Sequence, residues 1–292
     1  MLEGLIVSNV SDLFQVEIDN EIFECKVRGK FKKNEIFPVV GDFVKIEKIA
    51  NEKNKGIIEE ISPRKMYSKR PKIANLTQII LVISLESPKP DFLLLDKQLA
   101  YAEYLKIRPI ICINKIDLGK REVVDEIHQI YEKIGYKVVD TIANKEKVQC
   151  LEKLLNNEIT AFSGNSGVGK STLINSVFGE EKTQEGIISD RIKRGKNTTT
   201  NTTLYKIKNG YIADTPGFST FDITEIESNK LALYYKEFKQ YINDCEYLDC
   251  NHIKEENCGI KKALSEGKIS KQRYERYCKI FEELKDKEEH KW

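Results

Sequence analysis

A chain of 292 residues is longer than most single compact domains and suits two or three domains of common size. Hydrophobic residues make up 40% and charged residues 32%, a balance that excludes general disorder. The formal charge of +2 gives no argument for a polyanionic partner, so any such argument must come from local clusters. The apolar runs are far shorter than the ~20 residues of a membrane helix, and the first residues do not resemble a secretory signal. We therefore expect a cytoplasmic protein with no membrane contact.

Short β-rich segments fill residues 1 to about 62, and turn residues such as Asp19, Asn20 and Gly41 separate them. Their regular spacing predicts an all-β barrel over residues 1–65, of the OB-fold type or of the SH3-like type, which gives nearly the same pattern. OB-folds often bind RNA or single strands, but a fold alone leaves nucleic-acid contact open. The five expected strands are 5–10, 13–19, 21–29, 42–49 and 55–61.

The composition changes after Pro63, where five cations fall within nine residues. This pattern predicts a linker. Two interpretations remain open: a solvated connector, which is the usual role of a charge run, or a contact with a phosphate backbone beside the barrel. The five cations are Arg64, Lys65, Lys69, Arg70 and Lys72.

From Gln78 onward, strand-like and helix-like segments alternate, which is typical of an α/β domain. Residues 78–84 predict a buried strand, residues 91–105 a helix and residues 108–115 a second strand. The second strand ends in the motif N-K-x-D, formed by Asn114, Lys115 and Asp117. Ligands of such folds bind at the carboxyl ends of the strands, so we expect a nucleotide site here, within an α/β domain over residues 66–221.

Residues 164–171 match the P-loop pattern G-x-x-x-x-G-K-[ST] at every position. The motif follows a strand-like segment and opens a helix, as a phosphate-binding loop requires. In such a loop backbone N–H groups surround phosphate oxygens, the ammonium of Lys170 reaches the β and γ phosphates, and the hydroxyl of Ser171 binds Mg²⁺. The expected nucleotide-binding residues are Gly164, Asn165, Ser166, Gly167, Val168, Gly169, Lys170, Ser171 and Thr172.

A further strand-like segment, 210–213, ends in Asp214 and leads to Gly217, in the pattern D-x-x-G of GTPases. Asp214 is expected to approach Mg²⁺ through water, and the Gly217 N–H to sense the γ-phosphate. The base is set by Asp117, because a carboxylate accepts hydrogen bonds from the N1–H and the exocyclic amine of guanine, an edge that adenine lacks. The motifs therefore favour GTP over ATP.

Three thiols and one imidazole lie within fourteen residues near the C-terminus, at Cys245, Cys250, His252 and Cys258. Four protein ligands of these types close a tetrahedral coordination sphere, which predicts a structural Zn²⁺ rather than a catalytic one. Zinc should help to fold a segment with little core of its own. We expect a mostly helical zinc-binding domain over residues 222–292.

The order of the motifs is unusual, because ordinary GTPases carry the P-loop first and N-K-x-D last, whereas here N-K-x-D comes first. We therefore expect a circularly permuted domain. With the barrel before it and the cysteine cluster after it, the chain resembles, over essentially its whole length, the circularly permuted GTPases of the RsgA or YjeQ type, which assist small ribosomal subunit assembly. The resemblance implies binding of GTP or GDP with Mg²⁺ and contact with the 30S subunit and its rRNA.

The first switch is predicted at residues 191–200, where the chain departs from the family pattern. Family members commonly carry histidine before the threonine run, and this chain has Asn197, an amide that can orient water but is no useful base near neutral pH. Phe218 stands where Ras-like enzymes have a water-orienting glutamine. We expect slow intrinsic hydrolysis that a partner accelerates. The expected catalytic residues are Lys170, Thr199 and Asn197, and the Mg²⁺ residues are Ser171, Thr199 and Asp214.

Basic residues follow the cysteine cluster, and the resemblance favours contact with rRNA over an ordinary charged helix. We expect a monomer. Two rivals to a GTPase remain: a nucleotide-gated RNA-binding scaffold in which hydrolysis is incidental, and an ATP-dependent enzyme acting on a small substrate. The basic residues are Lys261, Lys262, Lys268, Lys271, Arg273, Arg276 and Lys279, with Tyr274 and Tyr277 among them.

Overall fold

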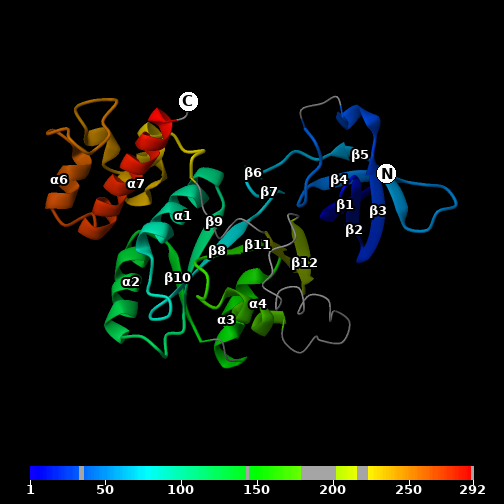
Figure 1. The fold of residues 1–292 in the computed structure, drawn as a ribbon, viewed down its shortest axis with the longest axis horizontal. Helices are drawn as coiled ribbons and strands as arrows, with labels where there is room; N and C mark the ends of the chain where they lie inside the picture. The colour runs from blue at the N-terminus through cyan, green and yellow to red at the C-terminus, as the bar shows by residue number, and fades with distance from the viewer. Residues whose placement is uncertain (33–35, 143–144, 179–201, 216–222, 291–292) are drawn as a thin grey trace. The chain divides into compact units, whose positions relative to one another are not determined.

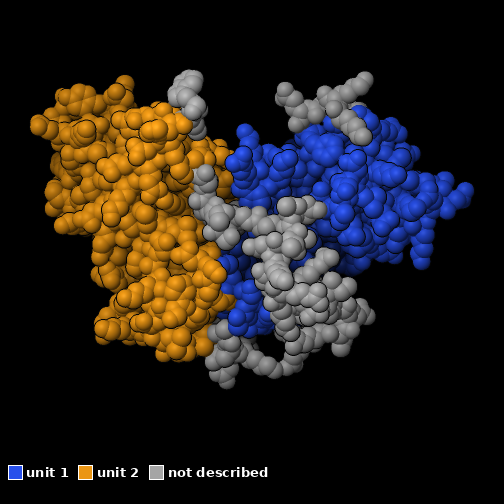
Figure 2. Space-filling model, in the orientation of Figure 1, with its two compact units in different colours: residues 1–80, 143–163, 170–219 blue, residues 81–142, 164–169, 220–292 orange. Residues whose placement is uncertain are grey.

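The computed structural model describes residues 1–32, 36–142, 145–178, 202–215 and 223–290. The chain forms two compact units, each built from several stretches of sequence (Figure 2). Unit 1 contains residues 1–80, 143–163 and 170–219, and unit 2 contains residues 81–142, 164–169 and 220–292. The three-domain division expected from sequence stays a prediction. In the described part of the chain, no helix is long and apolar enough to cross a membrane.

Unit 1 begins with a closed five-stranded barrel, as expected from the sequence (Figure 1). β1 pairs with both β2 and β4, and a parallel pairing of β3 with β5 completes the closure, in the strand order of an OB-fold. Alternate residues point inward, so Ile6, Phe14 and Ile46 are fully buried. The strands are β1 (Leu2–Val10), β2 (Leu13–Ile18), β3 (Glu21–Val27), β4 (Phe43–Lys48) and β5 (Lys55–Ile61); a short 3₁₀ helix, Gly29–Lys32, follows β3.

The segment expected to be a linker forms a small antiparallel hairpin instead, β6 (Tyr67–Lys69) and β7 (Lys72–Ala74). The sequence signal was weak because each strand has only three residues and Pro71 lies in the turn. Arg64, at its base, pairs with the buried carboxylate of Asp42, with Nε at 2.7 Å from Oδ1. This cation is structural, which corrects the view of the five cations as one solvated group.

The rest of unit 1 is α/β structure. β11 (Ile159–Ser163) runs parallel to β13 (Gly210–Asp214), and β12 (Thr203–Ile207) pairs antiparallel with β13. β12 also contacts the barrel, where Thr203 lies opposite Ser8 of β1. The helices are α3 (Lys145–Leu155) and α4 (Lys170–Phe178), which contact each other.

Unit 2 holds the strand order β10-β9-β8 with β10 (Lys137–Thr141) parallel to β9 (Arg108–Asn114). β8 (Gln78–Ser84) begins in unit 1 and continues into unit 2, and all seven of its residues are buried, as the apolar run predicted. The helices α1 (Phe92–Leu105) and α2 (Arg121–Lys133) follow β8 and β9. The sheet therefore presents the end of β9, and with it Asn114, at its carboxyl edge.

The C-terminal segment belongs to unit 2 and is mostly helical, as expected. Its core is aromatic: Phe238 and Tyr277 are buried with ring centroids 4.9 Å apart. The elements are η2 (Ser228–Tyr234), η3 (Lys236–Phe238), η4 (Ile242–Asp244), α6 (Gly259–Ser265) and α7 (Lys271–Glu289).

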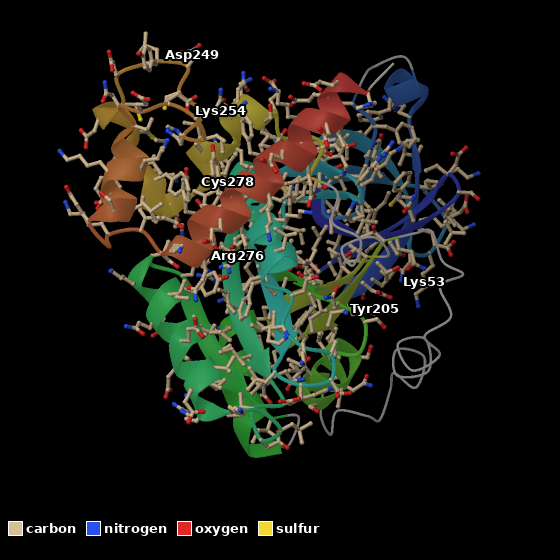
Figure 3. The ribbon with its side chains drawn as sticks, turned by 60° about the vertical axis from the view of Figure 1, so that its left-hand side comes forward. Lys53, Tyr205, Asp249, Lys254, Arg276 and Cys278 are labelled. Carbon is tan, nitrogen blue, oxygen red and sulfur yellow. The ribbon has the colours of Figure 1, made fainter. Side chains whose placement is uncertain are left out.

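A buried ion-pair cluster joins α7 to α1. Arg273 pairs with Asp96 of α1 and, through Nε, with Oε1 of Glu237 at 2.6 Å. Arg276 (labelled in Figure 3) also pairs with Asp96, to which the Tyr131 hydroxyl donates a hydrogen bond of 2.8 Å. The expectation that Arg273 and Arg276 form part of an RNA surface was therefore wrong, because both guanidinium groups face carboxylates inside unit 2.

Candidate nucleotide site and metal centre

The P-loop backbone explains its glycines. Gly164, Gly167 and Gly169 have φ values of 136°, 82° and 95°, a region that disfavours every residue with a Cβ. A Cβ on Gly164 would lie 2.1 Å from the carbonyl oxygen of Val82, and one on Gly169 would lie 2.3 Å from Nδ2 of Asn114. The loop is thus closely fitted to the ends of β8 and β9.

Asn114 connects the P-loop to the N-K-x-D motif. Its buried amide donates from Nδ2 to the Val168 carbonyl oxygen at 2.9 Å. Its Oδ1 accepts from the hydroxyl of Thr141, at the end of β10, at 3.2 Å. The two predicted motifs, far apart in sequence, are therefore held together by a direct hydrogen bond from Asn114 to the P-loop.

Lys115 adds a second connection. It adopts a left-handed backbone with φ of 58°, and its Nζ donates to the carbonyl oxygens of Gly167 at 2.7 Å and Ser87 at 2.6 Å. Asp117 follows two residues later with an exposed side chain. The motif thus divides into two residues that brace the loop and one carboxylate that is open to a ligand.

Asp91 also belongs to this site, although from the sequence we assigned it only to the start of a helix. It caps the N-terminus of α1 by accepting from the Leu94 N–H at 2.9 Å, and its other oxygen accepts from Nδ2 of Asn165 at 3.4 Å. A small hollow lies between the start of α1 and the P-loop, lined in part by Asp91, Gly164 and Asn165. An aspartate before an apolar helical run is an N-cap signal, but nothing local reveals that it also contacts the P-loop.

The remaining described residues of the predicted nucleotide site lie in unit 1. Lys170 begins α4 directly after Gly169 and is half-buried, and desolvation lowers the pKa of its ammonium group. Ser171 and Thr172 are exposed in the first turn of α4. Asp214 ends β13, beside the end of β11, and desolvation raises the pKa of its carboxyl group although the side chain as a whole is exposed. A cation beside Asp214 and an anion beside Lys170 would offset these two pKa shifts, because each would stabilise the charged form of its neighbour.

Three of the predicted residues cannot be placed. Asn197 and Thr199 of the first switch and Gly217 of the second lie outside the described residues. Their roles stay predictions.

The predicted metal ligands do converge. The ligand atoms of Cys245, Cys250, His252 and Cys258 all lie within 4.8 Å of one another. Nδ1 of His252 is 3.5 Å from the Cys245 sulfur and 3.4 Å from the Cys258 sulfur, so the imidazole presents this nitrogen to the cluster. Three sulfurs and one nitrogen at these separations fit a tetrahedral metal site.

Neighbouring groups fix the ligand loop. The Glu255 carboxylate accepts from the backbone N–H groups of Asn251 and Ile253, each at 2.9 Å. From α7, the Tyr274 hydroxyl donates to the His252 carbonyl oxygen at 2.7 Å. Burial raises the pKa of the Cys250 thiol to about 12, so a bound cation is needed to hold that sulfur as a thiolate at neutral pH.

Known proteins match this chain along its whole length. A family model described as RsgA GTPase matches residues 60–224, and one described as RsgA N-terminal domain matches residues 3–58. Curated proteins named small ribosomal subunit biogenesis GTPase RsgA are 40% identical to it: one from Clostridium botulinum strain Langeland over 100% of both chains, and one from Alkaliphilus metalliredigens over 98% of both.

Two solved structures agree. YjeQ from Thermotoga maritima matches with a TM-score of 0.83 at 35% identity, covering 97% of this chain and 98% of that one. YloQ, described as a circularly permuted GTPase, matches with a TM-score of 0.82 at 29% identity, covering 98% and 96%. The motif order, with Asn114 before Lys170, is that of such a permutation. The five-stranded barrel, the permuted α/β domain and the Cys₃His cluster are thus features of one fold, and the chain belongs to the RsgA GTPase family.

Proposed function

We propose that this protein binds GTP with Mg²⁺, hydrolyses it slowly by itself, and assists late maturation of the small ribosomal subunit, which stimulates the hydrolysis. The observation that carries the guanine-nucleotide assignment is the contact of Asn114 with Val168, because it joins the base-reading motif to the phosphate-binding loop. The name of the curated relatives supports the ribosomal role.

Each predicted site residue has a role in this proposal. The backbone N–H groups of residues 164–169 bind phosphate oxygens, and Lys170 neutralises charge on the β and γ phosphates. Ser171, Thr199 and, through water, Asp214 hold Mg²⁺, and Gly217 senses the γ-phosphate. Asp117 reads guanine. Asn197 orients the attacking water without accepting its proton, so chemistry stays slow until a partner completes the arrangement.

The Cys₃His cluster holds a structural Zn²⁺ in this proposal. Four protein ligands leave no position for a reacting water, so the metal supplies folding energy rather than catalysis. The protein acts in the cytoplasm as a monomer, with the 30S subunit and its rRNA as partners.

The test is steady-state GTP turnover with and without purified small ribosomal subunits at low salt, with large subunits as the control. We expect strong stimulation by small subunits alone, and turnover at least about 10²-fold lower in Lys170→Ala, which removes the phosphate-binding cation. Absence of stimulation would contradict the proposal. A single-turnover experiment with subunits tests the rival scaffold. If one round of GTP hydrolysis leaves the affinity for the subunit unchanged, the scaffold in which hydrolysis is incidental is favoured.

A further inference from the structure

Two paired strands of unit 1 lie next to the predicted switches in the sequence. β12 begins at Thr203, shortly after the first predicted switch at residues 191–200, and β13 ends at Asp214, the first residue of the D-x-x-G motif. In the antiparallel pair Thr203 lies directly opposite Asp214, and Lys206 lies directly opposite Tyr211. Residues directly opposite each other share one face of a sheet, so the side chains of Lys206 and Tyr211 are neighbours. A displacement of this strand pair would move the ends that lead to both switches.

One carboxylate of the barrel, that of Glu17 in β2, contacts both of these side chains. The Lys206 ammonium pairs with Glu17 and also donates from Nζ to Oδ1 of Asn20, in the turn between β2 and β3, at 2.6 Å. The Tyr211 hydroxyl donates to the Glu17 carboxylate, and desolvation together with this negative charge raises the pKa of Tyr211 to about 12. Only 9% of the Glu17 side chain is exposed. The carboxylate is therefore largely enclosed, with one partner on each of the two strands.

The contact with Glu17 gives β12 a second point of attachment to the barrel. The first is the antiparallel pairing of Thr203 with Ser8 of β1, at the start of the strand. Lys206 lies three residues further on, a distance of roughly 10 Å along a strand; Tyr205, the residue before it, is labelled in Figure 3. One point of attachment leaves a strand able to pivot, whereas two points define its direction. The pairing with Glu17 therefore orients β12, and with it β13.

The chemistry of this contact favours a role in geometry over a role in stability. Desolvation of a buried carboxylate offsets most of the attraction that an ion pair supplies, so the net gain in folding free energy is small. The direction of the contact is nevertheless well defined, because the Lys206 ammonium lies between Glu17 and Asn20, with Nζ 5.7 Å from the centroid of the Tyr211 ring. A group of this kind holds its partners in place more than it stabilises the fold.

We propose that Glu17 is a positioning residue for GTP hydrolysis, which fixes through Lys206 and Tyr211 the two strands that lead to the switches. The proposal rests on the proposed function, in which Asp214 approaches Mg²⁺ through water. A displacement of about 1 Å in a group that takes part in a reaction can lower the rate by up to about 10²-fold. The effect of Glu17 should therefore appear in kcat and in the Mg²⁺ requirement. Affinity for GDP should not depend on it, because that affinity is assigned to the P-loop and to Asp117.

The test uses the full-length protein and four single variants. Glu17→Gln keeps the size of the side chain and removes its charge. Glu24→Gln, at an exposed position of β3, removes the same charge from the barrel and is the matched control. Lys206→Arg keeps the cation, and Tyr211→Phe removes only the hydroxyl. GTP turnover is measured over a range of GTP and Mg²⁺ concentrations, with and without small ribosomal subunits, and GDP affinity is measured by competition against a fluorescent guanine nucleotide.

We expect Glu17→Gln to lower kcat by about 10-fold and to raise the Mg²⁺ concentration for half-maximal turnover by roughly 3-fold or more. Its KM for GTP, its GDP affinity and its melting temperature should stay close to those of the native protein. Tyr211→Phe should show a smaller loss of the same kind, because one of the two contacts remains. Lys206→Arg and Glu24→Gln should behave like the native protein.

Native values of kcat and of the Mg²⁺ requirement in Glu17→Gln would overturn the proposal. Equal losses in Glu17→Gln and Glu24→Gln would do the same, since they would reflect the charge of the barrel rather than the contact. A loss in Glu17→Gln that is accompanied by weaker GDP binding and a lower melting temperature, with an unchanged Mg²⁺ requirement, would show that the carboxylate only stabilises the fold.

The outcome stays separable from that of the proposed function. If small subunits fail to stimulate GTP turnover of the native protein, the proposed function fails, while the basal kcat and the Mg²⁺ requirement of Glu17→Gln still decide the role of Glu17. If subunits stimulate the native protein and Glu17→Gln to the same turnover at every Mg²⁺ concentration, only the proposal for Glu17 fails.

Discussion

Asn114 shows how much of the site depends on one side chain. Its amide is fully buried and bonds on one side to the P-loop carbonyl of Val168 and on the other to the Thr141 hydroxyl. An amide is suited to this position because it donates and accepts at once. Asp117, three residues later, is exposed, so bracing falls to Asn114 while base recognition is assigned to a different member of the same motif.

Replacing Asp117 with asparagine should change the preferred base. The amide can donate where the carboxylate only accepts, so it pairs with the O2 carbonyl of xanthine and no longer with the exocyclic amine of guanine. We expect the ratio of GDP to XDP affinity to fall by roughly 10⁴-fold, measured by competition against a fluorescent guanine nucleotide. Asp125→Asn, at an exposed position on α2, is the control. An unchanged base preference would refute the role assigned to Asp117.

At the scale of elements, α1 is the helix on which unit 2 is organised. Its capping residue Asp91 contacts Asn165 of the P-loop, and Asp96, one turn further on, receives Arg273 and Arg276 of α7. The partners around Asp96 balance its charge, and Glu237 completes the pairing of Arg273. One helix therefore contacts both the phosphate-binding loop and the C-terminal segment that carries the Cys₃His cluster, within the same unit.

Removing Arg273 should destabilise this arrangement strongly. In Arg273→Met, Glu237 loses its partner and Asp96 loses one of two, and breaking a buried pair costs about 3–5 kcal/mol. Urea denaturation should show a loss of this size, whereas Lys279→Met, at an exposed position of α7, should change stability by less than about 0.5 kcal/mol. The double variant Arg273→Met/Glu237→Gln should recover part of the loss, because it no longer buries an unpaired carboxylate. Equal stability of Arg273→Met and Lys279→Met would contradict this account.

Sequence predicted best where the signal was local and periodic. The apolar run of β8 predicted a buried strand, and the glycine spacing of the P-loop predicted a phosphate-binding loop. Both patterns are specific because burial and positive φ restrict the choice of residue at each position. The pairing of Asp96 with Arg273 could not be predicted, since any of the many charged residues could have been the partner. We assigned Arg273 to an RNA surface because of its charge, although its spacing of four residues from Tyr277 places it on the buried face of α7.

At the scale of the whole molecule, the Cys₃His cluster and the N-K-x-D motif belong to the same compact unit, although more than a hundred residues of sequence separate them. The ligand loop is fastened to α7 by Tyr274 and Tyr277, whose hydroxyls donate to the carbonyl oxygens of His252 and Asn251. The ligand loop therefore packs on α7, and α7 contacts α1 through the pairing of Arg273 with Asp96. The barrel belongs to the other unit, unit 1.

Metal removal should accordingly loosen unit 2 selectively. Without a cation the thiols of Cys250 and Cys258, whose pKa values are raised by desolvation, protonate and the ligand loop loses its cross-link, because metal binding supplies folding energy to such segments. We expect chelation to increase hydrogen exchange in α7 and α1, with exchange in β1 and β2 unchanged, measured by mass spectrometry. Cys278→Ser, outside the cluster, serves as the control for general thiol effects. Equal increases in the barrel and in α7 would show that the metal acts on the fold as a whole.

The close fit of Gly169 against Asn114 has a consequence for how this protein can evolve. Any larger residue at 169 would have to displace an amide that is buried and bonded on both sides. Gly169 and Asn114 are therefore expected to change together, although one belongs to the P-loop and the other to the N-K-x-D motif. Replacement of Asn114 would therefore disturb the phosphate-binding loop as well, whereas the base preference, which we assign to Asp117, could change without that cost.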